Sequence, residues 1–135
     1  MQKITLLEIN CWAIVVAAVA AFVTSFVWYM VFAKELAKVS TAIAEQKPEA
    51  WKMLVEVARS LVLAFVIAYV IGLIADVNWK GAVGIGILLW IGLSAVQWVG
   101  AILWENVPLK MAAIHAGDWL VKLVLISAIV GLWRR

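Results

Sequence analysis

Residues 110–133 read KMAAIHAGDWLVKLVLISAIVGLW, an apolar run with ionisable side chains near its centre. About twenty mostly apolar residues in a helix are enough to cross the hydrocarbon core of a bilayer. His115, Asp118 and Lys122 are three and four residues apart, so on an α-helix they share one face. Ionisable groups are costly inside a membrane and mark candidate functional sites. The stretch therefore predicts a membrane-spanning helix that carries a candidate site.

The composition of the whole chain also favours a membrane protein. The chain has 135 residues, of which 67% are hydrophobic and 14% charged, and a soluble domain of this size could not cover so much apolar surface. The net charge of +3 comes from scattered basic residues, which gives nucleic-acid binding little support. One cysteine and one histidine exclude an intrachain disulfide and the usual zinc or di-iron sites, so we expect no metal and no cofactor.

Three further apolar segments have spanning length, and the predicted spans are residues 9–32, 53–75, 81–104 and 110–133. We therefore predict an all-α integral membrane protein, a single domain over residues 1–135 that forms a compact bundle of four transmembrane helices. The first apolar run continues past Ala20, so we expect a retained span and not a cleaved signal peptide. Short links at 76–80 and 105–109 predict that consecutive spans are antiparallel neighbours.

The first connection, residues 33–47, has a different pattern. Leu36, Val39 and Ile43 recur at spacings of three and four, with lysines and glutamates between them. This pattern predicts an amphipathic helix in the membrane interface, and a helical hairpin in the cytosol is the alternative. Pro48 and Glu49 are typical of the first turn of the helix that becomes the second span.

The nine tryptophans fall into two groups. Six lie near predicted span ends, as an interfacial belt requires: Trp12, Trp28, Trp51, Trp79, Trp104 and Trp133. The other three, Trp90, Trp98 and Trp119, fall within spans. They are either packing or lipid-facing bulk, or an aromatic wall around a bound apolar molecule.

Small residues line one face of the first span, where Ala13, Ala17, Ala21 and Ser25 follow one another every four residues. Such stripes let helix backbones approach closely. They predict close packing either within the bundle or between subunits, and we expect a homo-oligomer.

Polar side chains from all four spans are predicted to meet in one leaflet. The second and fourth spans enter the membrane from the same side, so the depths of their residues can be compared at about 1.5 Å per residue. Thr24 and Ser25 of the first span reach the same depth as the polar residues of these two spans. Isolated charges at that depth would cost several kcal/mol, so we expect pairing or contact with water. The predicted intramembrane cluster consists of Glu56, Arg59, Gln97, His115, Asp118 and Lys122.

This cluster leaves two main hypotheses open. It is either a buried network that fixes helix register in an accessory or scaffold subunit, or a hydrated pocket for a small solute, an ion or a lipid-like ligand in a transport or binding protein. A third hypothesis is a membrane enzyme that uses His115 as a base. No catalytic motif supports it, so we expect no enzymatic activity.

Several stretches resemble a bacterial membrane family classed as domain of unknown function 1761. The resemblance rests on Ile9-Asn10, residues 12–23, Trp28-Tyr29, Glu105-Asn106-x-Pro108-Leu109-Lys110, Ala116-Gly117-x-Trp119-Leu120 and Trp133. It implies a four-helix protein of the bacterial cytoplasmic membrane and no particular activity. Basic residues are nearly balanced between the two sides, and the pair Arg134-Arg135 favours both termini inside.

Overall fold

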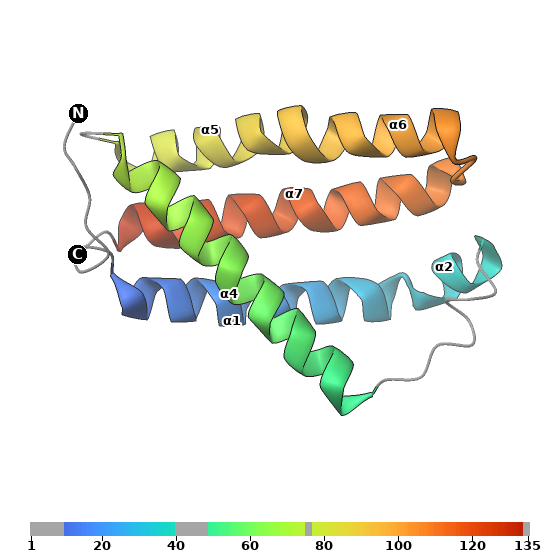
Figure 1. Cartoon of the computed structure of the whole chain (residues 1–135), viewed down its shortest axis with the longest axis horizontal. Coiled ribbons are helices and arrows are strands. Elements are labelled where there is room, and N and C mark those ends of the chain that lie inside the picture. Colours follow the sequence, from blue (N-terminus) through green and yellow to red (C-terminus); the bar gives the residue numbers. More distant parts are fainter. Residues whose placement is uncertain (1–9, 40–48, 75–76, 134–135) are drawn as a thin grey trace.

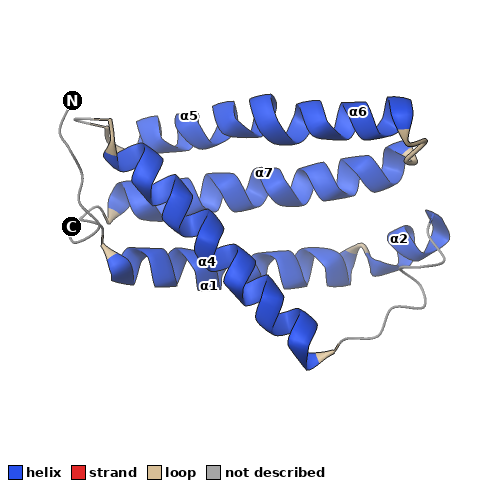
Figure 2. Cartoon of the chain, in the orientation of Figure 1, coloured by secondary structure: helices blue, strands red, loops and turns tan. Residues whose placement is uncertain are grey.

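The computed structural model describes residues 10–39, 49–74 and 77–133, and this part of the chain contains helices and no strands (Figure 2). The elements are α1 (Cys11–Val31), α2 (Ala33–Val39), α4 (Ala50–Gly72), α5 (Trp79–Leu89), the π-helical segment η2 (Trp90–Ala95), α6 (Val96–Trp104) and α7 (Leu109–Leu132). Four helical stretches are long and apolar enough to cross a membrane: Cys11–Val31, Ala50–Gly72, Trp79–Trp104 and Leu109–Leu132. The predicted all-α membrane fold is confirmed.

Polar caps set several of these bounds. Asn10 and Asn78 are extended, and each side-chain oxygen accepts the backbone N–H three residues on, so α1 begins at Cys11 and α5 at Trp79. The second span begins at Ala50, three residues before the predicted start at Met53, because a helix continues through the charged Lys52. It ends at Gly72, and the predicted end at residue 75 lies outside the described residues.

Helix α7 lies between α1 on one side and the stretch α5–η2–α6 on the other, and α4 crosses this layer diagonally (Figure 1). The apolar core forms where these helices approach most closely. Ala13, Ala17 and Ala21 are at most 1% exposed, so the small-residue stripe of α1 is used inside the chain. On α5, a Cβ on Gly86 would lie 2.8 Å from the carbonyl oxygen of Leu123, which requires glycine at this helix crossing.

The arrangement of α4 differs from the neighbouring spans that the short links predict. Helix α4 packs mainly on α1 and contacts α5 only weakly, although the link between α4 and α5 is short. Its N-terminal half diverges from the layer (Figure 1), and among the described residues none of α4 lies within 8 Å of α6, Cα to Cα. A short link fixes where two helices meet but leaves their crossing angle free.

The third span is one continuous helix whose middle turn, η2, is wider than an α-helical turn. In a π-helix the hydrogen bonds run from residue i to i+5, which adds a residue to the turn. The two α-helical halves of this span are therefore offset in register. Gly86 of the first half and Trp98 of the second half both contact α7.

The first connection starts with α2, in agreement with the expected helix. Leu36 is buried, and Glu35 forms ion pairs with Lys38 and with Lys110 at the start of α7. The remainder of the predicted amphipathic segment, including Ile43, lies outside the described residues.

Candidate functional site

Asp118 is the most deeply buried ionisable group among the described residues, with 1% of its surface exposed. Its Oδ1 accepts a hydrogen bond from the Ser25 hydroxyl at 2.6 Å. Its Oδ2 accepts one from the Tyr29 hydroxyl at 3.2 Å and lies 3.2 Å from Nζ of Lys122. A buried carboxylate stays ionised only when such donors and a counter-charge replace its lost hydration. Both oxygens of Asp118 have those partners.

Lys122 follows Asp118 by one turn of α7, and its side chain is 12% exposed. Its Nζ also lies 4.3 Å from the centroid of the Trp119 ring, close enough for a cation–π contact. The carboxylate and the indole face together accommodate a cation near the middle of a membrane-spanning helix.

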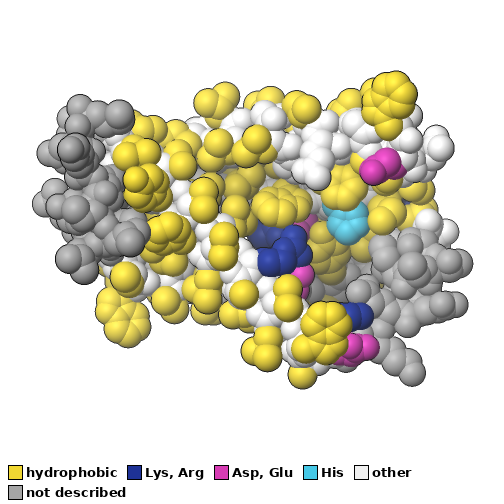
Figure 3. Space-filling view, in the orientation of Figure 1, with side chains coloured by type: hydrophobic (Ala, Val, Ile, Leu, Met, Phe, Trp, Pro, Cys, Tyr) yellow, Lys and Arg dark blue, Asp and Glu magenta, His cyan; other side chains and the backbone are white. Residues whose placement is uncertain are grey.

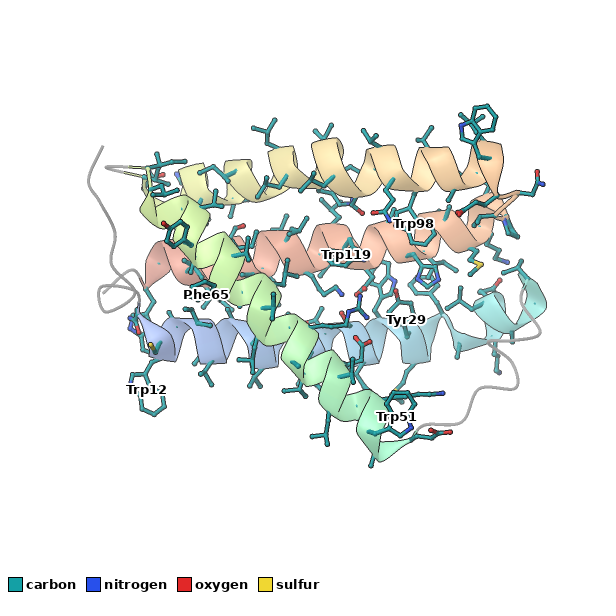
Figure 4. All side chains as sticks on the ribbon, in the orientation of Figure 1. Trp12, Tyr29, Trp51, Phe65, Trp98 and Trp119 are labelled. Carbon is teal, nitrogen blue, oxygen red and sulfur yellow. The ribbon has the colours of Figure 1, made fainter. Side chains whose placement is uncertain are left out.

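His115 is half-buried one turn before Asp118 and is held by aromatic side chains from two other helices. Its Nδ1 lies 2.7 Å from the Tyr29 hydroxyl of α1, and its ring stacks on Trp98 of α6 with centroids 5.0 Å apart and planes 7° apart. Figure 4 shows Tyr29 and Trp98 pointing toward α7 from opposite sides. The histidine thus connects the carboxylate network to an aromatic surface.

Two indole N–H groups fix the rotation of α7 at this level. Trp28 of α1 donates to the carbonyl oxygen of Ile114 at 3.0 Å, and Trp90 donates to that of Ala116 at 2.8 Å. Gly117 makes room for the first of these rings, since a Cβ there would lie 2.7 Å from Trp28 Cζ2. The tryptophans within and near the spans therefore position the site as well as filling space.

We call the hydrogen-bonded group of Ser25, Tyr29, His115, Asp118 and Lys122 the Asp118 cluster. It brings together three of the six predicted site residues, all from α7. The other three form no hydrogen bond with the cluster in the described part of the chain. Glu56 and Arg59 form an ion pair of 2.6 Å on α4, with side chains 46% and 57% exposed, and Gln97 is exposed on α6. Charged and histidine side chains gather on the face crossed by α4 (Figure 3).

Sequence reasoning missed Tyr29, and it placed Ser25 at the right depth without assigning it to the site. A signal for Tyr29 was present, because it is the next member of the four-residue series that contains Ala21 and Ser25. The three alanines of the series are buried, and its last two members, Ser25 and Tyr29, donate to the carboxylate of Asp118. Within the described residues, no three His, Cys, Asp or Glu side chains come together as a metal site.

The family model described as "Protein of unknown function (DUF1761)" matches residues 12–131. The chain belongs to this family. The match confirms the resemblance found in the sequence and covers every part of the Asp118 cluster. No curated protein and no solved structure is significantly similar to the chain. The family description names no activity.

Proposed function

We propose that this membrane protein binds or transports a small solute, an ion or a lipid-like ligand through the Asp118 cluster. The site lies on the face crossed by α4 (Figure 3), where the described residues of α4 and α6 are not in contact, and we call it the open face. The observation that carries the proposal is the exposed Glu56–Arg59 pair on a membrane-spanning helix. Arg59 is nine residues from the start of α4, about 14 Å along the helix axis. Charged side chains at such depth generally face water-filled cavities or polar partners, not lipid.

A second observation supports a bound molecule near this face. Ser94 of η2 is buried, and its Oγ has no hydrogen-bond partner in the described part of the chain. The antiparallel register, in which Trp98 meets His115, puts Ser94 opposite the turn of α7 that carries Asp118 and Trp119. An unsatisfied buried hydroxyl costs about 1–3 kcal/mol, which a water molecule or a ligand oxygen would offset.

Cysteine accessibility tests whether the open face is hydrated. In a Cys11→Ser background, Arg59→Cys would place a thiol on this face, and Val23→Cys would place one at similar depth on the exposed apolar side of α1. We expect a water-soluble thiosulfonate reagent to modify Arg59→Cys in lipid vesicles and to leave Val23→Cys unmodified. Equal protection of both thiols would contradict the proposal.

The alternative is an accessory or scaffold protein in which the cluster only specifies packing. The saturation of both Asp118 oxygens favours it. Replacing Asp118 by Leu and Lys122 by Met leaves the Ser25 and Tyr29 hydroxyls without their carboxylate, so the matched apolar variant also carries Ser25→Ala and Tyr29→Phe. If packing is the only role, this fourfold variant should fold as stably as the parent, as apolar replacements of buried ion pairs often do. Loss of ligand binding with folding retained would count against the scaffold.

We further propose a homo-oligomer without enzymatic activity in the bacterial cytoplasmic membrane, with both termini inside. The small residues of α1 are used within the chain, but a Cβ on Gly84, Gly92 or Gly100 would meet nothing within 4 Å. These glycines recur every eight residues on the third span and would permit close helix contact between subunits. Cross-linking in vesicles should then give dimers or larger species that Gly92→Leu abolishes, whereas a monomeric parent would exclude this assembly.

A further inference from the structure

The hydrogen bonds of the Asp118 cluster determine which nitrogen of His115 carries the proton. The Tyr29 hydroxyl has a single proton, which it donates to Oδ2 of Asp118. A charge-assisted bond to a carboxylate is stronger than a bond to a neutral imidazole nitrogen. The Tyr29 oxygen, 2.7 Å from Nδ1 of His115, therefore accepts a hydrogen bond from that nitrogen. A neutral His115 is thus protonated at Nδ1, and its Nε2 has a free lone pair.

Nε2 of His115 is available to a ligand. The ring is only half-buried, and in the described part of the chain its polar contact is the one made by Nδ1. Trp98 covers one face of the ring and holds its plane. The imidazole is therefore held at one nitrogen and on one face, with a hydrogen-bond acceptor directed elsewhere.

We propose that the site takes a membrane-soluble phenol, whose hydroxyl donates a hydrogen bond to Nε2 of His115. This inference rests on the proposed function and names its ligand class. An acceptor nitrogen selects a ligand with a donor, and the Trp98 ring that stacks on His115 favours an apolar aromatic body. The ring of a phenol delocalises charge that develops on its oxygen, so a phenol is a stronger donor to Nε2 than an aliphatic alcohol. Only a proton shifts toward Nε2; no bond to carbon is made or broken.

The tautomer can be measured directly because the chain has one histidine. In ¹⁵N-histidine-labelled protein in lipid nanodiscs, we expect the two imidazole resonances to show a protonated Nδ1 and an unprotonated Nε2. Tyr29→Phe removes the oxygen that fixes this tautomer and should shift the population toward protonated Nε2. A parent protein already protonated at Nε2 would overturn the inference.

Ligand selectivity is tested with 4-hexylphenol and its methyl ether, 4-hexylanisole, which differ by the hydroxyl proton. We expect the phenol to bind about tenfold more tightly, the value of one good hydrogen bond, and to shift the Nε2 resonance. His115→Phe keeps a flat ring beside Trp98 and should abolish the preference. Equal binding of phenol and ether to the parent would refute this ligand class.

The two proposals fail in different ways. If Arg59→Cys is accessible to water while the phenol shows no preference, the hydrated site stands and the phenol does not. If Arg59→Cys is protected, the open-face site itself is wrong, whatever the tautomer of His115.

Discussion

Replacing Asp118 with Asn provides the most direct test of the buried cluster. Asn keeps one acceptor oxygen but loses the charge that balances Lys122, whose side chain is only 12% exposed. Removing one partner of a buried ion pair typically costs about 3–5 kcal/mol, because the remaining charge has no compensation. The cation–π contact with the Trp119 ring remains in this variant and still stabilises the charge of Lys122 in part. We therefore expect a loss of about 3 kcal/mol in the free energy of unfolding.

The chain contains a matched control for this substitution. Glu56→Gln makes the same acid-to-amide change in an ion pair on α4 whose side chains are 46% and 57% exposed. A pair in contact with water is worth about 0–1 kcal/mol. Both variants can be unfolded with sodium dodecyl sulfate in mixed micelles while tryptophan fluorescence is followed. Equal losses for the two variants would refute the distinction between a dry and a hydrated pair.

Two further predictions concern packing and pH. In the same unfolding assay, Gly117→Ala should destabilise the protein by about 1–3 kcal/mol because its Cβ would overlap the Trp28 ring. The hydrogen bond and charge of Lys110 lower the pKa of Glu35 below its ordinary value of 4.5. The contact between α2 and α7 therefore contributes stability above pH 4.5 and loses it as the pH falls below that value, and Glu35→Gln should remove this part of the acid dependence of unfolding.

The spans could be predicted from the sequence because hydrophobic length is a direct physical requirement of the bilayer. The α7 part of the site was also readable, since a spacing of three and four residues fixes a common helix face. Its partners on α1 were only half readable. The four-residue series that begins at Ala13 consists of small residues as far as Ser25. Its next member, Tyr29, is ambiguous, because a tyrosine near a span end is also typical of the membrane interface.

The arrangement of α4 could not be predicted in the same way. A short link brings the end of one helix near the start of the next, but the crossing angle depends on side-chain packing along the whole length. Here α4 packs mainly on α1, and its described residues do not contact α6. Glu56 and Arg59 therefore stay outside the Asp118 cluster. The depth of a residue therefore indicates the leaflet in which it lies, but not the side chains that it contacts.

The wide turn η2 lets the third span hold one extra residue while both of its halves face α7. Losing one residue anywhere in Trp90–Ala95 would let an unbroken α-helix form, which is locally the more favourable hydrogen-bonding pattern. Gly86 and Trp98, twelve residues apart, would then be eleven apart, which is about three turns of an α-helix, so both would still face α7. Straightening η2 without such a loss would instead turn α6 by about 100° relative to α5 and take Trp98 away from the ring of His115. Relatives that carry a single-residue deletion at this point should consequently have an unbroken third span and keep the aromatic neighbour of the histidine.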